Sequence, residues 1–513
     1  MTLNKNPFVF PLLLTLCFFA LSLLGILHHE IWLDEAHSFV LSKDSSSFAD
    51  LFVNTRQEGH PMFWYLLLWL ITKFSHEVLA MQLLHIGIST LSVFLMARYA
   101  PFNNLKKTLF AFSYFFFYEY NILSRNYALG ILFVTCYLLL ICRERKKYPL
   151  IAITLLLLGN SHFIGLLLSL PLTLVAVLLL WREENQTSPA WLTYGILLTG
   201  FILGVVQVLP PENSIFSSVP RPGYFSIDRL SAFTVPFKAF YHFPDLSASY
   251  TWNTNLFTAN KFIGAILAFL FPFVLIKAFG TKPLSLAVVV LASAGISLFF
   301  YLGLMYGYTV RHWGFIFLAY YAAVWLQYGM DQTQYQIYLD RVLPKYFRTE
   351  NKSITKGLFY STLIIQVMAA CYAYTLDLNR NFCNAKEAAD YIKQHHYQNE
   401  LIILNGYMSG AAVSAYLDKS LYYPEYKGWG SYGKWDTKVW EIDKEELISQ
   451  IHALNNHQQA YLLMENKSFY PSDKKETGHV VFKDTACSIT YITSFDDAII
   501  NHEQFQFYKI TYE

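Results

Sequence analysis

The chain divides by its pattern of apolar and polar positions into a long series of apolar blocks and a polar tail. An apolar block of about 20 residues crosses a bilayer as a helix, and a shorter block crosses if it extends into its polar flanks. Eleven such blocks lie at residues 8–27, 78–99, 108–120, 127–142, 148–158, 162–181, 191–209, 262–279, 284–306, 313–328 and 358–374. The pattern therefore predicts an all-α, multi-pass membrane domain over residues 1–376, with about 11 to 13 transmembrane helices.

One apolar segment, residues 62–74, does not fit this count. Its sequence, MFWYLLLWLITKF, is apolar enough to cross but short, and a crossing there would reverse the side of every later loop. We therefore predict a helix that lies in the membrane interface, with Trp64, Tyr65 and Trp69 as its anchors.

Basic residues between the blocks indicate which side each loop faces. They cluster at residues 106–107, 143–147, 182, 277–282 and 341–356, and a pair of blocks separates each cluster from the next. Since Lys and Arg are enriched in cytoplasmic loops, we place these clusters and the N-terminus in the cytoplasm. The loop 28–77, the loop 210–260 and the polar tail then lie outside, as expected for a protein of a bacterial inner membrane.

Composition supports a membrane protein and excludes some partners. Of the 513 residues, 54% are hydrophobic and only 14% are charged, and the mean hydropathy is +0.31. Aromatic residues reach 18%, more than interfacial belts use, so we expect rings at helix contacts or in a cavity. A net charge of +2 supplies no polyanion-binding face, and the chain has no phosphate-binding loop motif, which argues against nucleic acid and nucleotide cofactors.

The tail has the composition of a soluble domain from Asp377 onward. Its periodicity predicts helices at 384–395 and 444–454 and strands at 401–404, 460–464 and 479–482, which together indicate a small α/β domain over residues 377–513. The stretch 429–435 (WGSYGKW) offers rings that would stack on a sugar or pack within a loop. Cys383 and Cys487 are candidates for a disulfide in an oxidising compartment.

The loop 28–77 carries the densest set of reactive side chains. A loop that only connected two helices would need a few turn residues, whereas this one holds Asp34, Glu35, His37, Asp44, Asp50, Glu58 and His60. Acids and imidazoles at a membrane boundary are costly to keep there, and they mark functional sites. We therefore expect the active site in this loop.

The order of these residues resembles a known family. An Asp-Glu pair (Asp34, Glu35) just after the first membrane helix, followed by Glu58 and His60-Pro61 before an aromatic-rich helix, is similar to the first outer loop of the C-type glycosyltransferases. These include protein O-mannosyltransferases and lipid A aminoarabinose transferases. The resemblance covers roughly residues 8–376 and departs at Met62, where many members have a second proline.

The resemblance implies a function. Members transfer a hexosyl or pentosyl group from a polyprenyl-phosphate donor to a glycan, lipid or protein acceptor on the outer side of the membrane. The loop acid acts as general base, and some members hold a metal near the loop carboxylates.

Two acids are the candidates for catalysis. Asp34 is the predicted general base, because a partly desolvated carboxylate gains basicity. The alternative for Asp34 is a helix-capping acid. Glu35 is the second candidate, although in a helix it would point elsewhere, which favours a structural role for it.

Cations are needed to hold the donor phosphate. Arg125, Arg311 and His312 are the predicted phosphate-binding residues, since unpaired cations near a membrane are costly. Glu119 is the alternative partner for Arg125. For Arg311 the alternative is a side chain that reaches to the membrane surface.

A divalent metal cation would be held by Asp34, Glu58 and His60, because carboxylates and imidazoles suit such ions. Alternatively, His60 forms a hydrogen bond with the loop backbone. His37, Tyr127 and His162 are expected to line the cavity, although a histidine in the position of His162 is also typical of a structural hydrogen bond.

Two other functions fit parts of the chain. A transporter or lipid flippase would also need membrane arginines and a cavity, but it predicts internal repeats and charges near helix midpoints. A membrane sensor would explain the tail and leave the polar loop unexplained. The polar residues gather at one face instead, which favours the glycosyltransferase.

Overall fold

The structure is a computed structural model of the protein. It describes residues 8–144, 146–182, 190–212, 214, 233–248, 250–279, 286–300, 309–330, 352–406, 409–435, 442–455, 460–465, 478–482, 485–500 and 503–512. The segment 215–232 of the predicted outer loop 210–260 lies outside these ranges.

Each of the eleven apolar blocks forms helix where the structure describes it. Ten blocks correspond to α1 (Val9–His28), α5 (Val78–Tyr99), α7 (Tyr127–Ile141), α8 (Tyr148–Gly159), α9 (Phe163–Arg182), α10 (Ala190–Val208), α12 (Lys261–Phe279), α13 (Leu286–Phe300), α14 (Val310–Gly329) and α15 (Lys352–Asn379). The block 108–120 is divided between α6 (Asn104–Ala111) and a π-helix, η1 (Tyr114–Glu119). In the described part of the chain, six helices are long and apolar enough to span a bilayer by themselves, namely α1, α5, α9, α10, α12 and α15. The predicted multi-pass helical membrane domain is confirmed.

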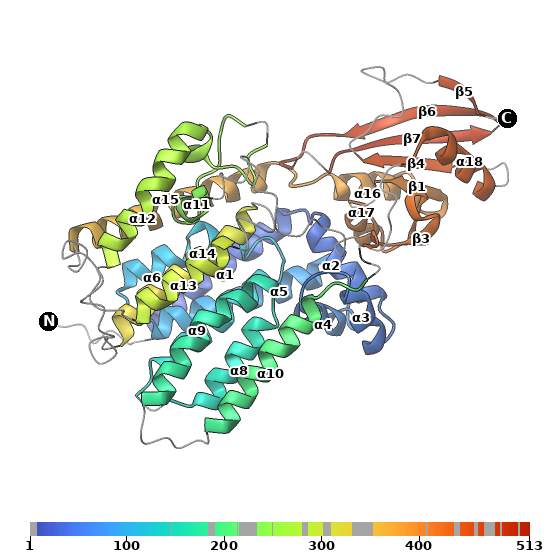
Figure 1. Ribbon diagram of the computed structural model, residues 1–513. Coiled ribbons are helices and arrows are strands. Elements are labelled where there is room, and N and C mark those ends of the chain that lie inside the picture. The colour runs from blue at the N-terminus through green and yellow to red at the C-terminus, as the bar shows by residue number, and fades with distance from the viewer. Residues whose placement is uncertain are drawn as a thin grey trace.

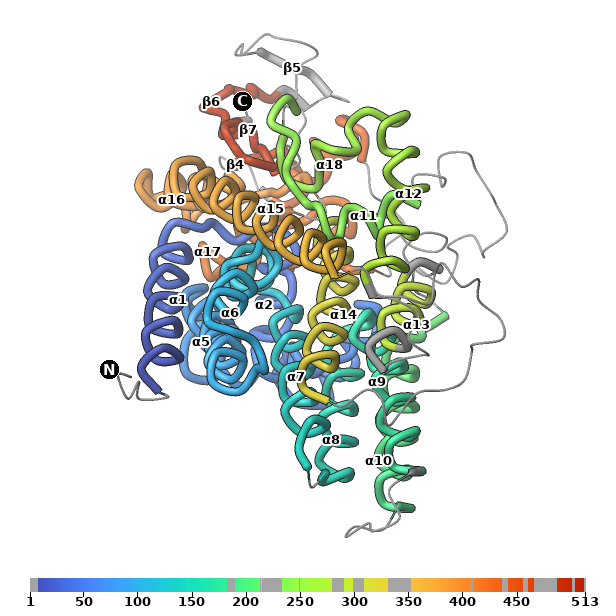
Figure 2. The backbone as a smooth tube through the Cα atoms, turned by 90° about the vertical axis from the view of Figure 1, so that its left-hand side faces the viewer, coloured from blue at the N-terminus to red at the C-terminus, as the bar shows by residue number. Residues whose placement is uncertain are grey.

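The membrane helices pack as one bundle around α7 and α14. In Figure 2, α1, α5 and α6 lie on one side of the bundle and α8, α9 and α10 on the other, with α15 crossing the upper part. Helix α14 is buried along nearly its whole length, and aromatic rings fill its contacts; the Tyr321 ring, for example, lies 5.1 Å from both Phe110 and Phe116. By contrast, α10 and α12 present many exposed apolar side chains, as expected for surfaces that face lipid.

The polar loop folds into three short helices: α2 (Leu33–Asp44), α3 (Phe48–Thr55) and α4 (Phe63–Ile71). With nine residues, α4 is about 14 Å long and too short to cross a bilayer. It packs against α2, and its Trp64 and Tyr65 are each only 1% exposed. Those two rings are core residues and not the interfacial anchors that the sequence predicted, because a short apolar helix does not reveal which of its faces is covered.

The tail forms a seven-stranded mixed sheet with three helices, which confirms the expected α/β domain. The helices are α16 (Ala385–Gln394), α17 (Gly410–Leu417) and α18 (Lys444–Asn455). The strand order is β3-β2-β1-β4-β7-β6-β5, with β1 (Leu401–Asn405) parallel to β2 (Leu421–Tyr423) and β4 (Ala460–Glu465). The other pairs, which involve β3 (Gly428–Gly430), β5 (Gly478–Phe482), β6 (Thr485–Phe495) and β7 (Phe505–Tyr512), are antiparallel.

The sheet domain sits at one end of the helical bundle, next to α2 (Figure 1). Helix α17 packs against α2, and the Tyr416 hydroxyl accepts a hydrogen bond of 2.8 Å from the Ile31 N–H. Lys43 and Asp418 form an ion pair of 2.5 Å across the same contact. Cys383 and Cys487 are buried in separate cores and form no disulfide with each other, so the suggested disulfide between them is wrong.

Candidate active site

Carboxylates fix the start of α2, the helix that carries Asp34. The Glu35 carboxylate accepts the backbone N–H of Trp32 at 3.2 Å, and Glu503 from the sheet domain accepts the N–H of Leu33 at 2.9 and 3.1 Å. The first N–H groups of a helix lack partners within the helix, and acids at that end also interact favourably with its dipole. The position of Asp34 is therefore set from two sides, by its own helix and by the C-terminal domain.

Asp34 is held by two arginines from distant parts of the chain. Its Oδ2 atom lies 2.7 Å from Nη1 of Arg311, at the start of α14, and 3.8 Å from Nη2 of Arg125, in the turn before α7. Arg125 also donates to the backbone oxygen of Asp34 and, at 2.7 Å, to the hydroxyl of Ser38. The structure thus brings together three residues that the sequence predicted for one site. Glu119, the alternative partner of Arg125, instead accepts from Tyr114 and Trp252.

The arginines dominate the electrostatics of Asp34. Burial by itself would raise the pKa of this carboxyl, but Arg311 and Arg125 outweigh burial and lower the pKa to about 2. The pKa of Arg125 rises above its usual value, because Asp34 outweighs the effect of burial. At neutral pH the resting site therefore holds an ionised Asp34, paired with guanidinium groups, that is a weak base.

Two tryptophans flank the Arg311 guanidinium. Its central carbon lies 5.0 Å from the centroid of the Trp32 ring and 5.9 Å from that of Trp252, and the two rings meet edge to face. Such cation–π contacts orient the guanidinium plane, and the N–H donors in that plane bind oxygen atoms. The sequence analysis missed both rings, although Trp32 stands only two positions before Asp34.

Three histidines and a tyrosine gather from four separate segments. The His162 ring lies 4.6 Å from His60, 4.7 Å from Tyr127 and 6.4 Å from His312. Burial, with a further contribution from Arg125, lowers the pKa of His60 to about 4, and burial also lowers the pKa of His162. Both rings are therefore neutral at pH 7 and act there as hydrogen-bonding groups.

His162 also forms the structural hydrogen bond that was its alternative role. Its Nδ1 accepts from the N–H of Ile164 at 2.9 Å, while its Nε2 atom is buried. The two roles are compatible, because one ring nitrogen fixes the ring and the other faces its neighbours. That His37, Tyr127 and His162 line a donor cavity stays a prediction.

Glu58 joins the polar loop to the sheet domain. Its Oε1 lies 2.9 Å from Nε2 of His37 and accepts from Nε1 of Trp435 at 3.0 Å, and its Oε2 accepts from Tyr65 at 3.2 Å. The His37 ring packs edge to face on Tyr432, 5.1 Å away. Tyr432 and Trp435 of the aromatic stretch 429–435 thus lie against the polar loop, a location that sequence periodicity could not reveal.

The predicted metal ligands do not converge. Asp34 faces Arg311, Glu58 faces His37, Tyr65 and Trp435, and His60 packs on His162. Among the residues that the structure describes, no group of three His, Cys, Asp or Glu side chains is placed to hold a metal ion. Guanidinium groups occupy the position next to Asp34 where a cation would bind, so the residues present do not fit the predicted metal.

Glu35 faces away from Arg311, into a buried charge cluster. Its Oε2 lies 3.0 Å from Nε2 of His29, whose Nδ1 lies 2.8 Å from Oδ2 of Asp377, near the end of α15. Burial acts to lower the pKa of His29, but Asp377 and Glu35 outweigh it and raise the pKa to about 10. A charged His29 between two carboxylates connects the ends of α1 and α15 to the start of α2.

Comparison with known proteins gives a weak likeness to two solved structures. No family model matches the chain, and no curated protein sequence matches it. It is similar to the crystal structure of ArnT from Cupriavidus metallidurans bound to undecaprenyl phosphate, with a TM-score of 0.48, 11% identity and 97% of each chain covered. The apo structure of the same protein gives a TM-score of 0.46 and 11% identity over 96% of this chain and 97% of that chain. At these values, the assignment of a function depends on this chain's own residues.

Proposed function

We propose that this protein is a C-type membrane glycosyltransferase, which transfers a hexosyl or pentosyl group from a polyprenyl-phosphate donor to an acceptor outside the bacterial inner membrane. The observation that supports it most is the contact of Asp34 with Arg311 and Arg125 at one end of a multi-pass bundle. One acid and two guanidinium groups are what such a transfer needs from a protein, a base for the acceptor and a clamp for the leaving phosphate.

The resting ion pair suggests how the base becomes active. A donor phosphate carries negative charge and competes with Asp34 for the donors of Arg311 and Arg125. When the guanidinium groups turn to the phosphate, Asp34 loses the interactions that hold its pKa near 2, and burial then raises that pKa. Binding of the donor thereby converts a neutralised carboxylate into a base.

The reaction then balances without a further reactant. Asp34 takes the proton of the acceptor hydroxyl or amine, and the acceptor atom forms a bond to the anomeric carbon. The bond from that carbon to the phosphate oxygen breaks, and its electron pair leaves with the polyprenyl phosphate, which Arg311 and Arg125 hold. His60 and His162, which are neutral, and the nearby His312 are hydrogen-bonding groups that could contact the sugar or the phosphate.

Glu35 has a positioning role in this proposal. Its oxygens accept from His29 and from the backbone N–H groups of Trp32 and Ser124, which leaves it tied to the protein and not to a substrate. Its contribution is to fix the first turn of α2, so that the Asp34 carboxylate stays in place between the two arginines.

Transfer of labelled sugar from a panel of polyprenyl-phosphate donors tests the proposal, with purified wild-type protein and the Asp34→Asn variant. Asn keeps the shape of the side chain and removes the base. We expect transfer by the wild type and a decrease of about 100-fold or more in the variant, the range for loss of a general base. Asp50→Asn is the matched control, because Asp50 is an exposed acid of the same loop that lies in α3.

The outcomes separate the alternatives. Equal transfer by wild type and Asp34→Asn removes Asp34 as base while leaving the enzyme class intact. Absence of transfer by wild type across the donor panel, with movement of the labelled lipid between leaflets, would support the flippase instead.

A further inference from the structure

A pocket lined by lysines and aromatic residues lies at the far end of the bundle from Asp34. It has a volume of about 320 Å³ and lies between α6, the ends of α12 and α14, and the first turns of α15. Helix α14 connects the two places, since Arg311 stands near its start and Tyr328 near its end. A helix of 20 residues is about 30 Å long, the thickness of a bilayer core, so the pocket and Asp34 face opposite sides of the membrane.

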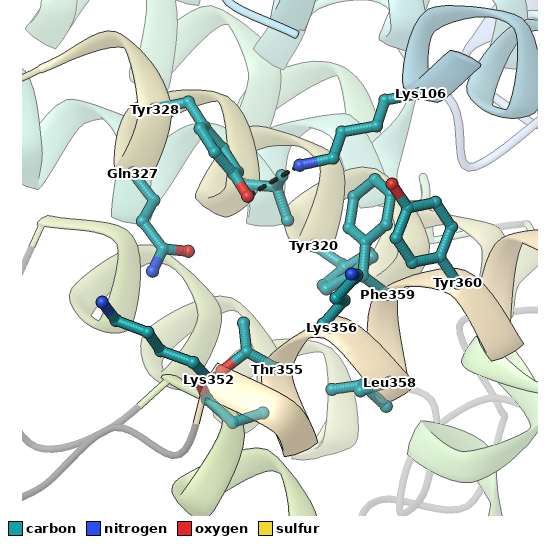
Figure 3. A pocket seen from close by; sticks show the side chains of 12 residues that line it. Lys106, Tyr320, Gln327, Tyr328, Lys352, Thr355, Lys356, Leu358, Phe359 and Tyr360 are labelled. Carbon is teal, nitrogen blue, oxygen red and sulfur yellow. Dashed lines mark hydrogen bonds between the residues drawn. The ribbon is translucent and has the colours of Figure 1, made fainter. Parts of the chain in front are cut away.

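Three lysines surround this pocket. Lys106, Lys352 and Lys356 line it, and among the residues that the structure describes its lining includes no Asp or Glu. Figure 3 shows the three amines around one space. Lys352 and Lys356 are four positions apart on one helix face, where like charges repel. In the described part of the chain, none of the three lysines forms an ion pair, so the arrangement favours a bound anion.

Aromatic rings fix one of these lysines. The Lys106 amine donates to the Tyr328 hydroxyl at 2.7 Å and lies 4.1 Å from the centroid of the Tyr328 ring and 4.9 Å from that of Phe359. A snorkelling lysine would extend freely into the headgroup region. Lys106 is instead already held at the pocket edge, so its side chain would lose less conformational entropy when an anion binds.

The surroundings of the pocket indicate a lipid. By the distribution of basic residues, this end of the bundle faces the cytoplasm. Ala278 brings the end of α12 to the pocket, and along the same helix Phe269, Phe273 and Ile276 are exposed apolar side chains, the kind that contact acyl chains. Basic pockets between helices on the cytoplasmic side bind the headgroups of anionic lipids.

We propose that this pocket binds the phosphate headgroup of an anionic phospholipid from the cytoplasmic leaflet, with its acyl chains along α12. The lipid phosphate takes the place between Lys106, Lys352 and Lys356, where it relieves their mutual repulsion. It thereby joins α6, α14 and α15 at the end of the bundle opposite Asp34. This site is independent of the proposed transfer reaction, since it shares no residue with the Asp34 site.

Native mass spectrometry of the purified full-length protein tests the proposal. The probes are dioleoyl phosphatidylglycerol, dioleoyl phosphatidylcholine and inorganic phosphate, each titrated separately. We expect one tightly held phosphatidylglycerol per chain and weaker binding of the other two probes. Lys352→Gln/Lys356→Gln should weaken phosphatidylglycerol binding by about tenfold or more, since each basic residue near an anionic headgroup contributes about 1 kcal/mol.

Arg143→Gln/Lys147→Gln is the matched control, because it removes two charges from the same face outside the pocket. Equal weakening by both pairs would mean general attraction to a basic surface and would overturn the proposal. Equal binding of phosphatidylcholine, or displacement of phosphatidylglycerol by an equal concentration of phosphate, would overturn it as well, the latter in favour of a site for free phosphate.

A second variant does not depend on removing a lysine. Gln327→Glu places a carboxylate at the pocket edge, where it pairs with the lysines in place of the lipid. We expect lost phosphatidylglycerol binding with an unchanged or higher unfolding temperature in detergent. Undiminished lipid binding by this variant would contradict the proposed location.

Discussion

Nη1 of Arg311 lies 2.7 Å from Oδ2 of Asp34, so the start of a late membrane helix is joined to the first helix of the polar loop. Neither residue reveals the other in the sequence, because the contact depends on how α14 and α2 end at the same face of the bundle. A substitution at either residue therefore tests the same contact.

Arg311→Gln should destabilise the resting protein, and the effect should depend on pH. Asp34 has a pKa of about 2 in the folded protein against 3.8 unfolded, so its pairing contributes stability that is present above pH 3.8 and lost as the pH falls through 2. The difference of about two pKa units corresponds to about 2 kcal/mol, less some screening by solvent. Unfolding temperatures in detergent should therefore differ most at neutral pH, approach each other below about pH 4 and converge below about pH 2. A constant difference across this range would argue against the ion pair as its source.

His29→Gln should lower the free energy of unfolding more than Arg311→Gln does, because it leaves Glu35 and Asp377 buried without their shared cation. Breaking a buried ion pair costs about 3 to 5 kcal/mol. The pKa of His29 is raised from 6.5 to about 10, so the stability it contributes is complete below pH 6.5 and is lost as the pH rises through 10. The difference between wild type and variant should thus shrink from pH 7 to pH 10, as measured by thermal unfolding. His395→Gln, at an exposed histidine, should show no such trend.

Chelation tests the metal prediction that the geometry does not support. Because Asp34 is held by guanidinium groups and Glu58 by hydrogen-bond donors, we expect EDTA treatment to leave sugar transfer unchanged. Metal content of the purified protein, measured by elemental analysis, should be well below one ion per chain. Activity lost to EDTA and restored by a divalent cation would show instead that substrate binding assembles a metal site.

Gly314→Ala should displace Tyr120, which forms a hydrogen bond with the backbone of Arg311. A Cβ atom at this position of α14 would overlap the hydroxyl of Tyr120 and the ring of Phe115, and Tyr120 donates to the backbone oxygen of Arg311. We expect the free energy of unfolding to fall by about 1 to 3 kcal/mol, as for overpacking in other cores, and sugar transfer to be reduced. Gly295→Ala in α13 meets no neighbouring atoms and should be neutral or stabilising, since Ala favours helix. Similar unfolding temperatures for the two variants would contradict this contact.

Much of the fold was predictable, because the bilayer sets the length of apolar blocks. The block 78–99 matches α5 at both ends, most other blocks match their helices within a few residues, and the block 108–120 is divided between α6 and η1. The strands β6 and β7 were missed, although Phe505 and Phe507 in β7 show the alternation of a half-buried strand. β7 pairs with β4 across about 40 residues of sequence and β6 pairs with β7, both antiparallel, and local patterns do not show such pairings.

The candidate site was predictable in its parts and not in its contacts. Asp34, Arg125 and Arg311 were found because charges at a membrane boundary are rare. The pairing of Glu58 with His37 and Trp435, in place of a metal, depends on the docking of the sheet domain on α2. Sequence periodicity predicts single helices and strands, whereas the docking of one domain on another depends on the surfaces of both.

The contact of Glu503 with the Leu33 N–H has a consequence for biosynthesis. A ribosome delivers the helix of Asp34 to the membrane near the start of translation, whereas Glu503 emerges hundreds of residues later. During that interval the first turn of α2 lacks this cap, so the nascent protein is inserted before the helix of Asp34 is fully fixed. A chain released before residue 503 would thus be a membrane protein with its helices in place and an incomplete candidate site.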